Sequence, residues 1–237
     1  MNEIVIRVVY DNRKDNEAMV EGWGFSCLID LGPRKVLFDT GADQGAFFLN
    51  LEKLKINCRD ITDVVFSHKH SDHIAGFREV LARVKSGARV FLPKGFPTHA
   101  LPSNVQVSIV TDWMEIDTQV YSLVLRGGFR LYEQALVIEM GKGLVVVTGC
   151  AHPGIIKLLE IAQKRLKRPL HLVLGGFHLF NKRRRFVSKI VDKFKTLQVE
   201  RAAPCHCSGD GAIAQFQEVY QDRFHKIGTG SILTLPR

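Results

Sequence analysis

Short apolar runs that end in histidine-containing segments, each followed by a helical pattern, constrain the fold of this chain most strongly. Residues 64–66 run into Ser67-His68-Lys69-His70-Ser71-Asp72-His73, and apolar residues at helical spacing follow from Ile74 to Val84. The same order recurs over residues 144–162, 171–197 and 201–220. Because α/β folds place their ligands where a strand ends and a helix begins, we predict an α/β fold with its functional site at these strand ends.

Hydrophobic periodicity and turn residues predict the other elements. Strands are expected at residues 4–9, 25–31, 36–38, 64–66, 90–92, 144–148, 171–174, 201–203 and 224–235. Helices are expected at residues 44–55, 74–84, 155–162, 186–197 and 212–220, with Pro153 in the first turn of the third. Residues 95–140 are expected to form short β segments and turns. No Ser/Pro/Gly-rich linker divides the chain, so we expect one domain over residues 1–237.

The composition is typical of a soluble globular protein, with 46% hydrophobic and 24% charged residues. The first residues lack the pattern of a signal peptide, and no apolar run approaches the ~20 residues that cross a bilayer. The five cysteines are an odd number, and two of them flank His206, which does not favour a secreted disulfide framework. We therefore expect a cytoplasmic protein with no membrane segment.

The motif at residues 68–73 holds four side chains that can bind a metal. In an extended segment, His68 and His70 point to the same side and can share one ion. Asp72 and His73 then turn into the helix and face a second position. Imidazole and carboxylate suit zinc, iron or manganese rather than calcium. The alternative is a hydrophilic loop that is rich in histidine by chance, and the density of ligands disfavours it.

This motif resembles the H-x-H-x-D-H signature of the metallo-β-lactamase superfamily. Leu37-Phe38-Asp39-Thr40-Gly41 resembles the family's upstream aspartate motif, and His152 and His206 resemble the histidines of its third and fifth motifs. The resemblance implies a four-layer αββα sandwich, in which two mixed β-sheets are flanked by helices. It also implies one or two divalent metals, with His152 completing the first site and His206 the second. Zinc is the expected metal, and manganese, iron or magnesium are the alternatives.

A finer resemblance involves residues 148–154, 175–179 and 204–209. These segments are similar to a subgroup named for 7,8-dihydropterin-6-methyl-4-(β-D-ribofuranosyl)aminobenzene 5′-phosphate synthase, an enzyme that joins a pterin diphosphate to a phosphorylated acceptor and releases diphosphate. One departure from the superfamily is clear, because its fourth motif usually supplies a bridging aspartate and residues 174–178 contain no carboxylate. We hypothesise that His178 lies in the active site. The alternative is that His178 caps the next segment outside the metal shell.

Other residues near these motifs have two interpretations each. Asp39 is expected to orient a metal ligand by a hydrogen bond, and the alternative is an ordinary turn aspartate. Cys150, Cys205 and Cys207 flank His152 and His206, and Cys205 or Cys207 could bind zinc as a thiolate. In strand geometry, however, His206 points away from its two flanking cysteines, so small buried side chains are favoured for them.

The charge of the chain is +9, from 33 Lys and Arg against 24 Asp and Glu. A positive excess of this size is typical of proteins that bind nucleic acid, anionic lipid or a phosphorylated substrate, and it also occurs on surfaces that contact only solvent. Lys182 and Arg183 closely follow His178, and Ser208 and Gly209 open a predicted helix with Ser208 as its N-cap. We expect these residues to contact a substrate phosphate, and ordinary capping is the alternative for Ser208.

The leading hypothesis is a metal-dependent hydrolase or transferase that acts on a small phosphorylated substrate such as a pterin diphosphate. A bound metal can activate water or act as a Lewis acid on leaving diphosphate, with Asp72 as ligand and local base. Alternative functions are a hydrolase of a phosphoester or lactone, a nuclease, and a non-catalytic metal-binding or ligand-sensing protein. A nuclease is disfavoured because 237 residues leave little room for a nucleic-acid-binding region. The sequence leaves the oligomeric state open, including a homo-oligomer.

Overall fold

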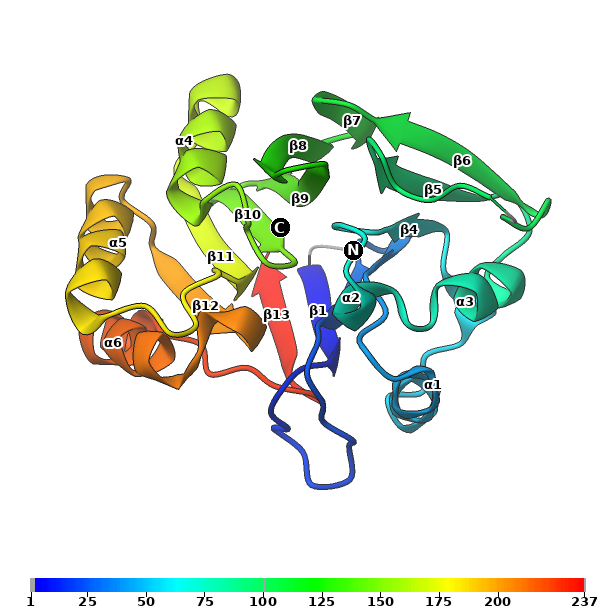
Figure 1. The fold of residues 1–237 in the computed structure, drawn as a ribbon, viewed down its shortest axis with the longest axis horizontal. Coiled ribbons are helices and arrows are strands. Elements are labelled where there is room, and N and C mark those ends of the chain that lie inside the picture. Colours follow the sequence, from blue (N-terminus) through cyan, green and yellow to red (C-terminus); the bar gives the residue numbers. More distant parts are fainter. Residues whose placement is uncertain (1–2, 100, 237) are drawn as a thin grey trace. The chain divides into compact units, whose positions relative to one another are not determined.

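A computed structural model describes residues 3–99 and 101–236 of the chain, which forms two compact units (Figure 1). Unit 1 consists of Met1–Val110 and Gly228–Arg237, and unit 2 of Thr111–Ile227. Each unit has one β-sheet of its own. Within the described residues, no helix is both long and apolar enough to cross a membrane. The expected single domain over the whole chain stays a prediction.

Unit 1 has a seven-stranded mixed sheet in the order β13-β1-β2-β3-β4-β5-β6. The pairs β13/β1, β1/β2 and β2/β3 are antiparallel, and β3 to β6 run parallel. The strands are β1 (Glu3–Tyr10), β2 (Ser26–Asp30), β3 (Lys35–Phe38), β4 (Asp63–Val65), β5 (Ala88–Pro93), β6 (Val105–Val110) and β13 (Ile232–Pro236). The helices are α1 (Gln44–Lys53), α2 (Ser71–Ile74) and α3 (Phe77–Arg83).

The core of unit 1 fixes the end of β4, from which the histidine motif begins. Val64 on β4 is fully buried and packs in one cluster with apolar residues of α1 and α3, among them Phe47 and Leu81. The ring of Phe66, directly after β4, lies edge-on to that of Phe77 with centroids 5.0 Å apart. Burial of such side chains contributes roughly 1.5–3 kcal/mol each, so the segment that leads into His68 is held by the core.

Unit 2 has a six-stranded mixed sheet in the order β12-β11-β10-β9-β8-β7. The strands β7 to β10 pair antiparallel, and β10, β11 and β12 run parallel. The strands are β7 (Trp113–Asp117), β8 (Val120–Gly128), β9 (Leu131–Met140), β10 (Gly143–Thr148), β11 (Leu170–Gly176) and β12 (Arg201–Cys205). The helices are α4 (Ile155–Leu166), α5 (Arg184–Thr196) and α6 (Asp210–Tyr220), and their apolar faces share one core cluster with the sheet.

The predicted fold class is confirmed, since the structure has two mixed β-sheets flanked by helices. The middle of the chain was expected to hold short β segments and turns, which is correct for β6 and β7 but was wrong for the next two strands. The strands β8 and β9 have 9 and 10 residues and pair with each other. Buried Glu133 and Gln134 interrupt the apolar pattern of β9 and hide the length of the strand.

Three predicted boundaries were also wrong for local reasons. The helix over residues 74–84 is divided, because the backbone N–H of Gly76 donates to Thr40 Oγ1 at 3.2 Å and Gly76 caps α3. Pro153 lies before α4, whose N-cap is Gly154 at φ 98°. Of the strand expected over residues 224–235, only the end belongs to β13.

A polar cluster lies where β11 and β12 begin. His171 Nδ1 is 2.7 Å from Glu200 Oε2, and Arg201 Nη1 donates to His225 Nε2 at 3.2 Å. Arg201 Nε also lies 3.6 Å from Glu200 Oε1. Burial, together with the nearby Arg201 and His171, lowers the pKa of His225. The folded protein therefore holds His225 neutral more firmly than the unfolded chain does.

We predict that His225→Gln makes stability less dependent on pH. Between the folded-state pKa of His225 and its ordinary value of about 6.5, the unfolded chain binds more protons, so stability falls as the pH is lowered through this window. Glutamine does not titrate and can still accept from Arg201. Urea unfolding at about pH 7.5 and pH 5.5 should show a smaller loss of free energy than in the parent. His99→Gln, at an exposed position, is the control, and equal losses in both variants would contradict the prediction.

Candidate metal centre

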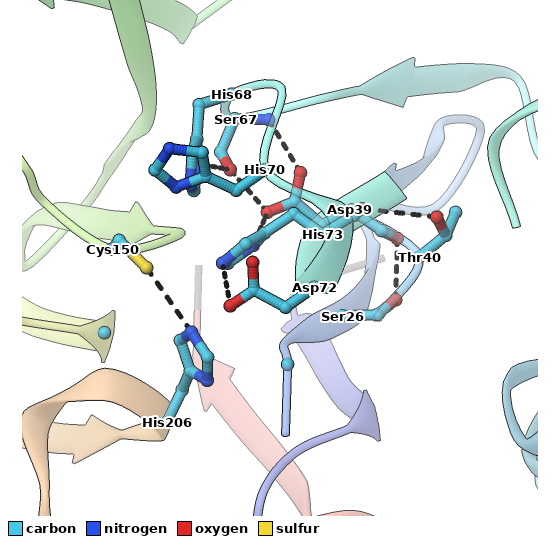
Figure 2. A network of polar contacts seen from close by, with 12 residues as sticks. Ser26, Asp39, Thr40, Ser67, His68, His70, Asp72, His73, Cys150 and His206 are labelled. Carbon is cyan, nitrogen blue, oxygen red and sulfur yellow. Dashed lines mark hydrogen bonds and ion pairs between the residues drawn. The ribbon is translucent and has the colours of Figure 1, made fainter. Parts of the chain in front are cut away.

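In unit 1, the structure brings His68, His70, Asp72 and His73 together in the segment after β4 and in α2 (Figure 2). His68 Nε2 lies 3.0 Å from His70 Nδ1, which is close enough for both nitrogens to contact one ion. The ring centroids of His68 and His73 are 4.3 Å apart. His73 Nε2 lies 3.6 Å from Asp72 Oδ2. The predicted local base Asp72 is thus next to a predicted metal ligand.

Asp39 directly follows β3, and its side chain contacts residues of the histidine motif. Its buried carboxylate accepts from the Ser67 backbone N–H through Oδ1 at 2.6 Å and from Ser67 Oγ through Oδ2 at 2.6 Å. Oδ2 also lies 2.7 Å from His73 Nδ1. A carboxylate at this distance keeps the proton on Nδ1, so Nε2 is the nitrogen that can bind a metal.

The same network reaches His68 through Ser67. Ser67 Oγ has one proton and donates it to Asp39, so it accepts from His68 Nδ1, which lies 2.9 Å away. This contact leaves the ligand role to Nε2 of His68 as well. Asp39 therefore contacts one predicted ligand directly and a second through Ser67, which is the position that the predicted orienting role requires.

The backbone of Asp39 is left-handed, with φ 57°. Ser26 Oγ donates to its carbonyl at 2.7 Å, and its N–H donates to Val65 O at 3.0 Å. The next residue is held as well, because the N–H of Thr40 donates to His73 O at 2.8 Å. A left-handed backbone costs a non-glycine residue roughly 1–2 kcal/mol, and these bonds offset that cost.

In unit 2, Glu133 plays the corresponding part, and the sequence analysis missed it. This carboxylate lies on β9 and is 1% exposed. Its Oε1 accepts from the N–H groups of Cys150 at 2.8 Å and Ala151 at 2.7 Å. Its Oε2 accepts from the His152 N–H at 2.8 Å and lies 2.8 Å from His152 Nδ1. The signal in the sequence was the adjacent polar pair Glu133 and Gln134 beside the apolar run of residues 135–138.

His206 follows β12 in a short turn, His206–Ser208, with φ 47°. Its Nε2 lies 3.3 Å from Cys150 Sγ (Figure 2). Cys205 and Cys207 are buried as expected, but Cys207 does not face only the apolar core. Cys207 Sγ belongs to one group with Cys150 and His178, because the chain leaves strand geometry at His206.

The Cys207 thiol has an unusual environment. Burial alone would raise the pKa of Cys207, but hydrogen bonds with Cys150 and His178 and the nearby His206 lower it well below its usual value. The hydrogen bond with Cys207 in turn raises the pKa of His178. The thiolate form of Cys207 and the protonated form of His178 therefore stabilise each other.

His178 lies beside His152, with ring centroids 4.5 Å apart. It is exposed and has a left-handed backbone with φ 54°.

The residues that were predicted to contact a substrate phosphate differ in their exposure to solvent. Lys182 and Arg183 are exposed, and Arg183 is the N-cap of α5.

Ser208 is fully buried, and its Oγ accepts from the Phe177 N–H at 3.0 Å. The N-cap of α6 is Gly209 at φ 74°, so the prediction of Ser208 as the cap was wrong by one residue. Ser208 thus fixes the end of β11 against the turn that carries His206. Gly209 remains at the start of a helix, as expected.

The end of β11 has no room for the carboxylate that the superfamily usually places there. A Cβ at Gly175, where φ is 114°, would lie 2.0 Å from Thr148 O. A Cβ at Gly176 would lie 2.3 Å from Gly149 O and 2.6 Å from Cys207 Sγ. The two glycines are therefore required by packing, and no bridging aspartate fits at either position.

The predicted ligands are residue types that bind divalent metals. Those in unit 1 are three imidazoles and one carboxylate, and those in unit 2 are two imidazoles, with Cys150 Sγ 3.3 Å from His206 Nε2. In both units a buried carboxylate fixes Nδ1 of a predicted ligand, Asp39 for His73 and Glu133 for His152. Imidazole nitrogens oriented by such partners are typical ligands of zinc and related ions.

Comparisons with known proteins agree with this description. Residues 24–166, more than half of the chain, match the family model of the metallo-beta-lactamase superfamily. The chain is 24% identical to the 7,8-dihydropterin-6-methyl-4-(beta-D-ribofuranosyl)-aminobenzene-5′-phosphate synthase of Methanocaldococcus jannaschii, over 89% of either chain.

Two solved structures are similar to the whole chain. Tm1679, described as a metal-dependent hydrolase of the beta-lactamase superfamily, is 28% identical with a TM-score of 0.84, over 99% of this chain and 100% of that one. The metallo-beta-lactamase fold protein YhfI from Bacillus subtilis is 13% identical with a TM-score of 0.70, over 97% of this chain and 99% of that one.

Proposed function

Since the chain belongs to the metallo-beta-lactamase superfamily of metal-dependent enzymes, we propose that it catalyses a group transfer from a small diphosphate substrate of the pterin type to a phosphorylated acceptor, with release of diphosphate. The proposed metal ligands are His68, His70, Asp72, His73, His152 and His206. Zinc is the proposed metal, and manganese, iron and magnesium are the alternatives.

The observation that carries this proposal is the glycine-only end of β11. A carboxylate that bridges two metals helps a hydrolase to hold both ions around one water, and Gly175 and Gly176 leave no space for it. A bound metal would instead supply a Lewis acid for the oxygens of a leaving phosphate group. The similarity to a synthase over most of the chain supports the same chemistry.

The residues of the chain have distinct tasks in this proposal. Asp39 and Glu133 hold His73 and His152 in the tautomers that bind metal. Asp72, beside His73, can accept the proton that the acceptor loses. His178 is exposed next to His152 and can donate a hydrogen bond to a substrate oxygen. The exposed Lys182 and Arg183 attract the anionic substrate.

A hydrolase of a phosphoester or lactone is the second candidate, favoured by the description of Tm1679 at 28% identity. The two candidates differ in whether the acceptor is required. A nuclease and a non-catalytic sensor remain predictions. A steep salt dependence of RNA binding would favour the nuclease.

The test is to supply the zinc- or manganese-loaded protein with a dihydropterin diphosphate, with or without a ribofuranosylaminobenzene phosphate, and to measure diphosphate release. Release that requires the acceptor supports the transferase. Release without it identifies a hydrolase, and no turnover at full metal content overturns the proposal. Lys182→Ala/Arg183→Ala should raise KM about tenfold, since the two exposed ion pairs with the substrate contribute about 0–1 kcal/mol each and roughly 1.4 kcal/mol corresponds to a factor of ten. Lys157→Ala/Lys164→Ala, which removes two exposed cations of α4, is the matched control.

A further inference from the structure

We propose that unit 2 contains a metal site of its own, formed by Cys150, His178 and Cys207, which binds a thiophilic divalent ion such as zinc. One ligand atom from each of these residues lies within 4.8 Å of the other two. The group shares no ligand with the set proposed above, but it borders on that set, because Cys150 Sγ lies 3.3 Å from His206 Nε2 and the ring of His178 lies beside that of His152. Its donors are two sulfurs and one imidazole nitrogen.

The topology of the sheet explains why these three side chains meet. The strands β10, β11 and β12 are parallel neighbours, so their C-terminal ends lie at one edge of the sheet. They end at Thr148, Gly176 and Cys205. Cys150, His178 and Cys207 each come two residues after one of these ends. The same offset from three adjacent strands places the three side chains in one group.

The residues around this group leave room for its sulfur atoms and hold its turns together. Gly176 has no Cβ, and a Cβ there would lie 2.6 Å from Cys207 Sγ, so the glycine provides the space that the sulfur occupies. Cys207 Sγ also lies 3.6 Å from Cys150 O. The N–H groups of Leu179 and Phe180 donate to Cys207 O at 3.1 and 2.9 Å, which ties the turn after His178 to the turn that holds Cys207.

The backbone at this group is costly to form. Ala151, next to Cys150, has φ 57°, and His178 has φ 54°. A left-handed conformation is unfavourable for alanine and for histidine, and such conformations persist where the surrounding structure holds them, often at ligand sites. Here the Ala151 N–H donates to Glu133 at 2.7 Å. The side chains of the group are thus arranged before any ion binds.

The chemistry of the donors sets the class of ion. Two thiolates and one imidazole select zinc over magnesium or manganese, which prefer oxygen ligands. Within the described residues, no cysteine forms a disulfide, so the sulfurs of Cys150 and Cys207 are not bonded to another cysteine. Three protein ligands leave the fourth tetrahedral position for a water or another small ligand.

Cobalt(II) loading of the full chain tests this site, because thiolate ligands give a charge-transfer absorption band that imidazole and carboxylate do not. We expect the band in the parent and in His68→Ala/His70→Ala, which removes two ligands of unit 1. We expect its loss in Cys150→Ser/Cys207→Ser, with one ion per chain fewer by elemental analysis. Cys205→Ser, a buried cysteine of the same unit outside the group, is the matched control and should keep the band.

A second measurement covers the case in which the double variant does not fold. In the parent protein, zinc should slow alkylation of Cys150 and Cys207, read by mass spectrometry, and should leave the rate at Cys58 unchanged. His178→Ala should weaken this protection at least tenfold. No charge-transfer band and no protection would overturn the proposal, as would a band that disappears in His68→Ala/His70→Ala.

Discussion

Asp39→Asn is expected to leave the chain folded and to lower its metal affinity by 10- to 100-fold or more. The amide oxygen can take the place of Oδ1 and accept from the Ser67 N–H. The amide NH₂ then takes the place of Oδ2 and faces Ser67 Oγ and His73 Nδ1. Both of these atoms can accept a hydrogen bond, so the packing is kept. His73, however, must then carry its proton on Nε2, the nitrogen that a metal needs.

Competition with a chelator measures the affinity, and ¹⁵N NMR of the imidazoles reports the tautomer of His73. Asp43→Asn is the matched control, because Asp43 caps α1 through the Ala46 N–H at 2.7 Å and asparagine caps equally well. If Asp39→Asn binds metal within a factor of three of the parent, the orienting role of Asp39 is wrong. A change of tautomer without loss of metal would refute the assignment of Nε2 as the ligand.

Glu133→Gln is expected to destabilise the fold by about 3–5 kcal/mol, because its partners cannot reverse their roles. At the place of Oε1, the amide NH₂ would face the N–H groups of Cys150 and Ala151. At the place of Oε2, it would face the N–H of His152. Backbone N–H groups only donate, so either orientation leaves buried donors opposed to each other. The segment with His152 should therefore detach from β9.

Urea unfolding measures this loss, and the metal content of the folded fraction shows whether His152 is still held. Glu139→Gln is the control on the same strand, since Glu139 forms only a partly exposed ion pair with Arg168 at 3.4 Å. Such pairs contribute about 0–1 kcal/mol. If the two variants lose equal stability, the four contacts of Glu133 are not what fixes the segment after β10.

The roles of Asp39 and Glu133 differ in how well they could be predicted from the sequence. The group at residues 68–73 is local, because strand spacing followed by a helix turn already brings its side chains together. Asp39 could be predicted as well, since it belongs to a recognisable motif after an apolar strand. Glu133 could not, because its role depends on the antiparallel pairing of β9 with β10, which no local pattern fixes.

Predictions from the sequence also failed at the ends of strands. Strand alternation predicted Cys205 and Cys207 on the side opposite His206, but a left-handed residue at His206 ended the alternation there. The same effect moved the N-cap of α6 from Ser208 to Gly209. The strand β10, which is apolar almost throughout, and the helix α5, whose apolar residues recur at helical spacing, were predicted within a few residues.

The left-handed residues Asp39, Ala151, His178 and His206 have a consequence for protein engineering. Glycine adopts this backbone without steric cost, so glycine at these positions relieves the folded state. At His178 and His206, a directed-evolution screen that rewards heat resistance alone therefore favours glycine, which removes an imidazole that the proposals above assign to metal binding. Selection on metal content in the same screen is needed to keep a thermostable descendant from losing its chemistry.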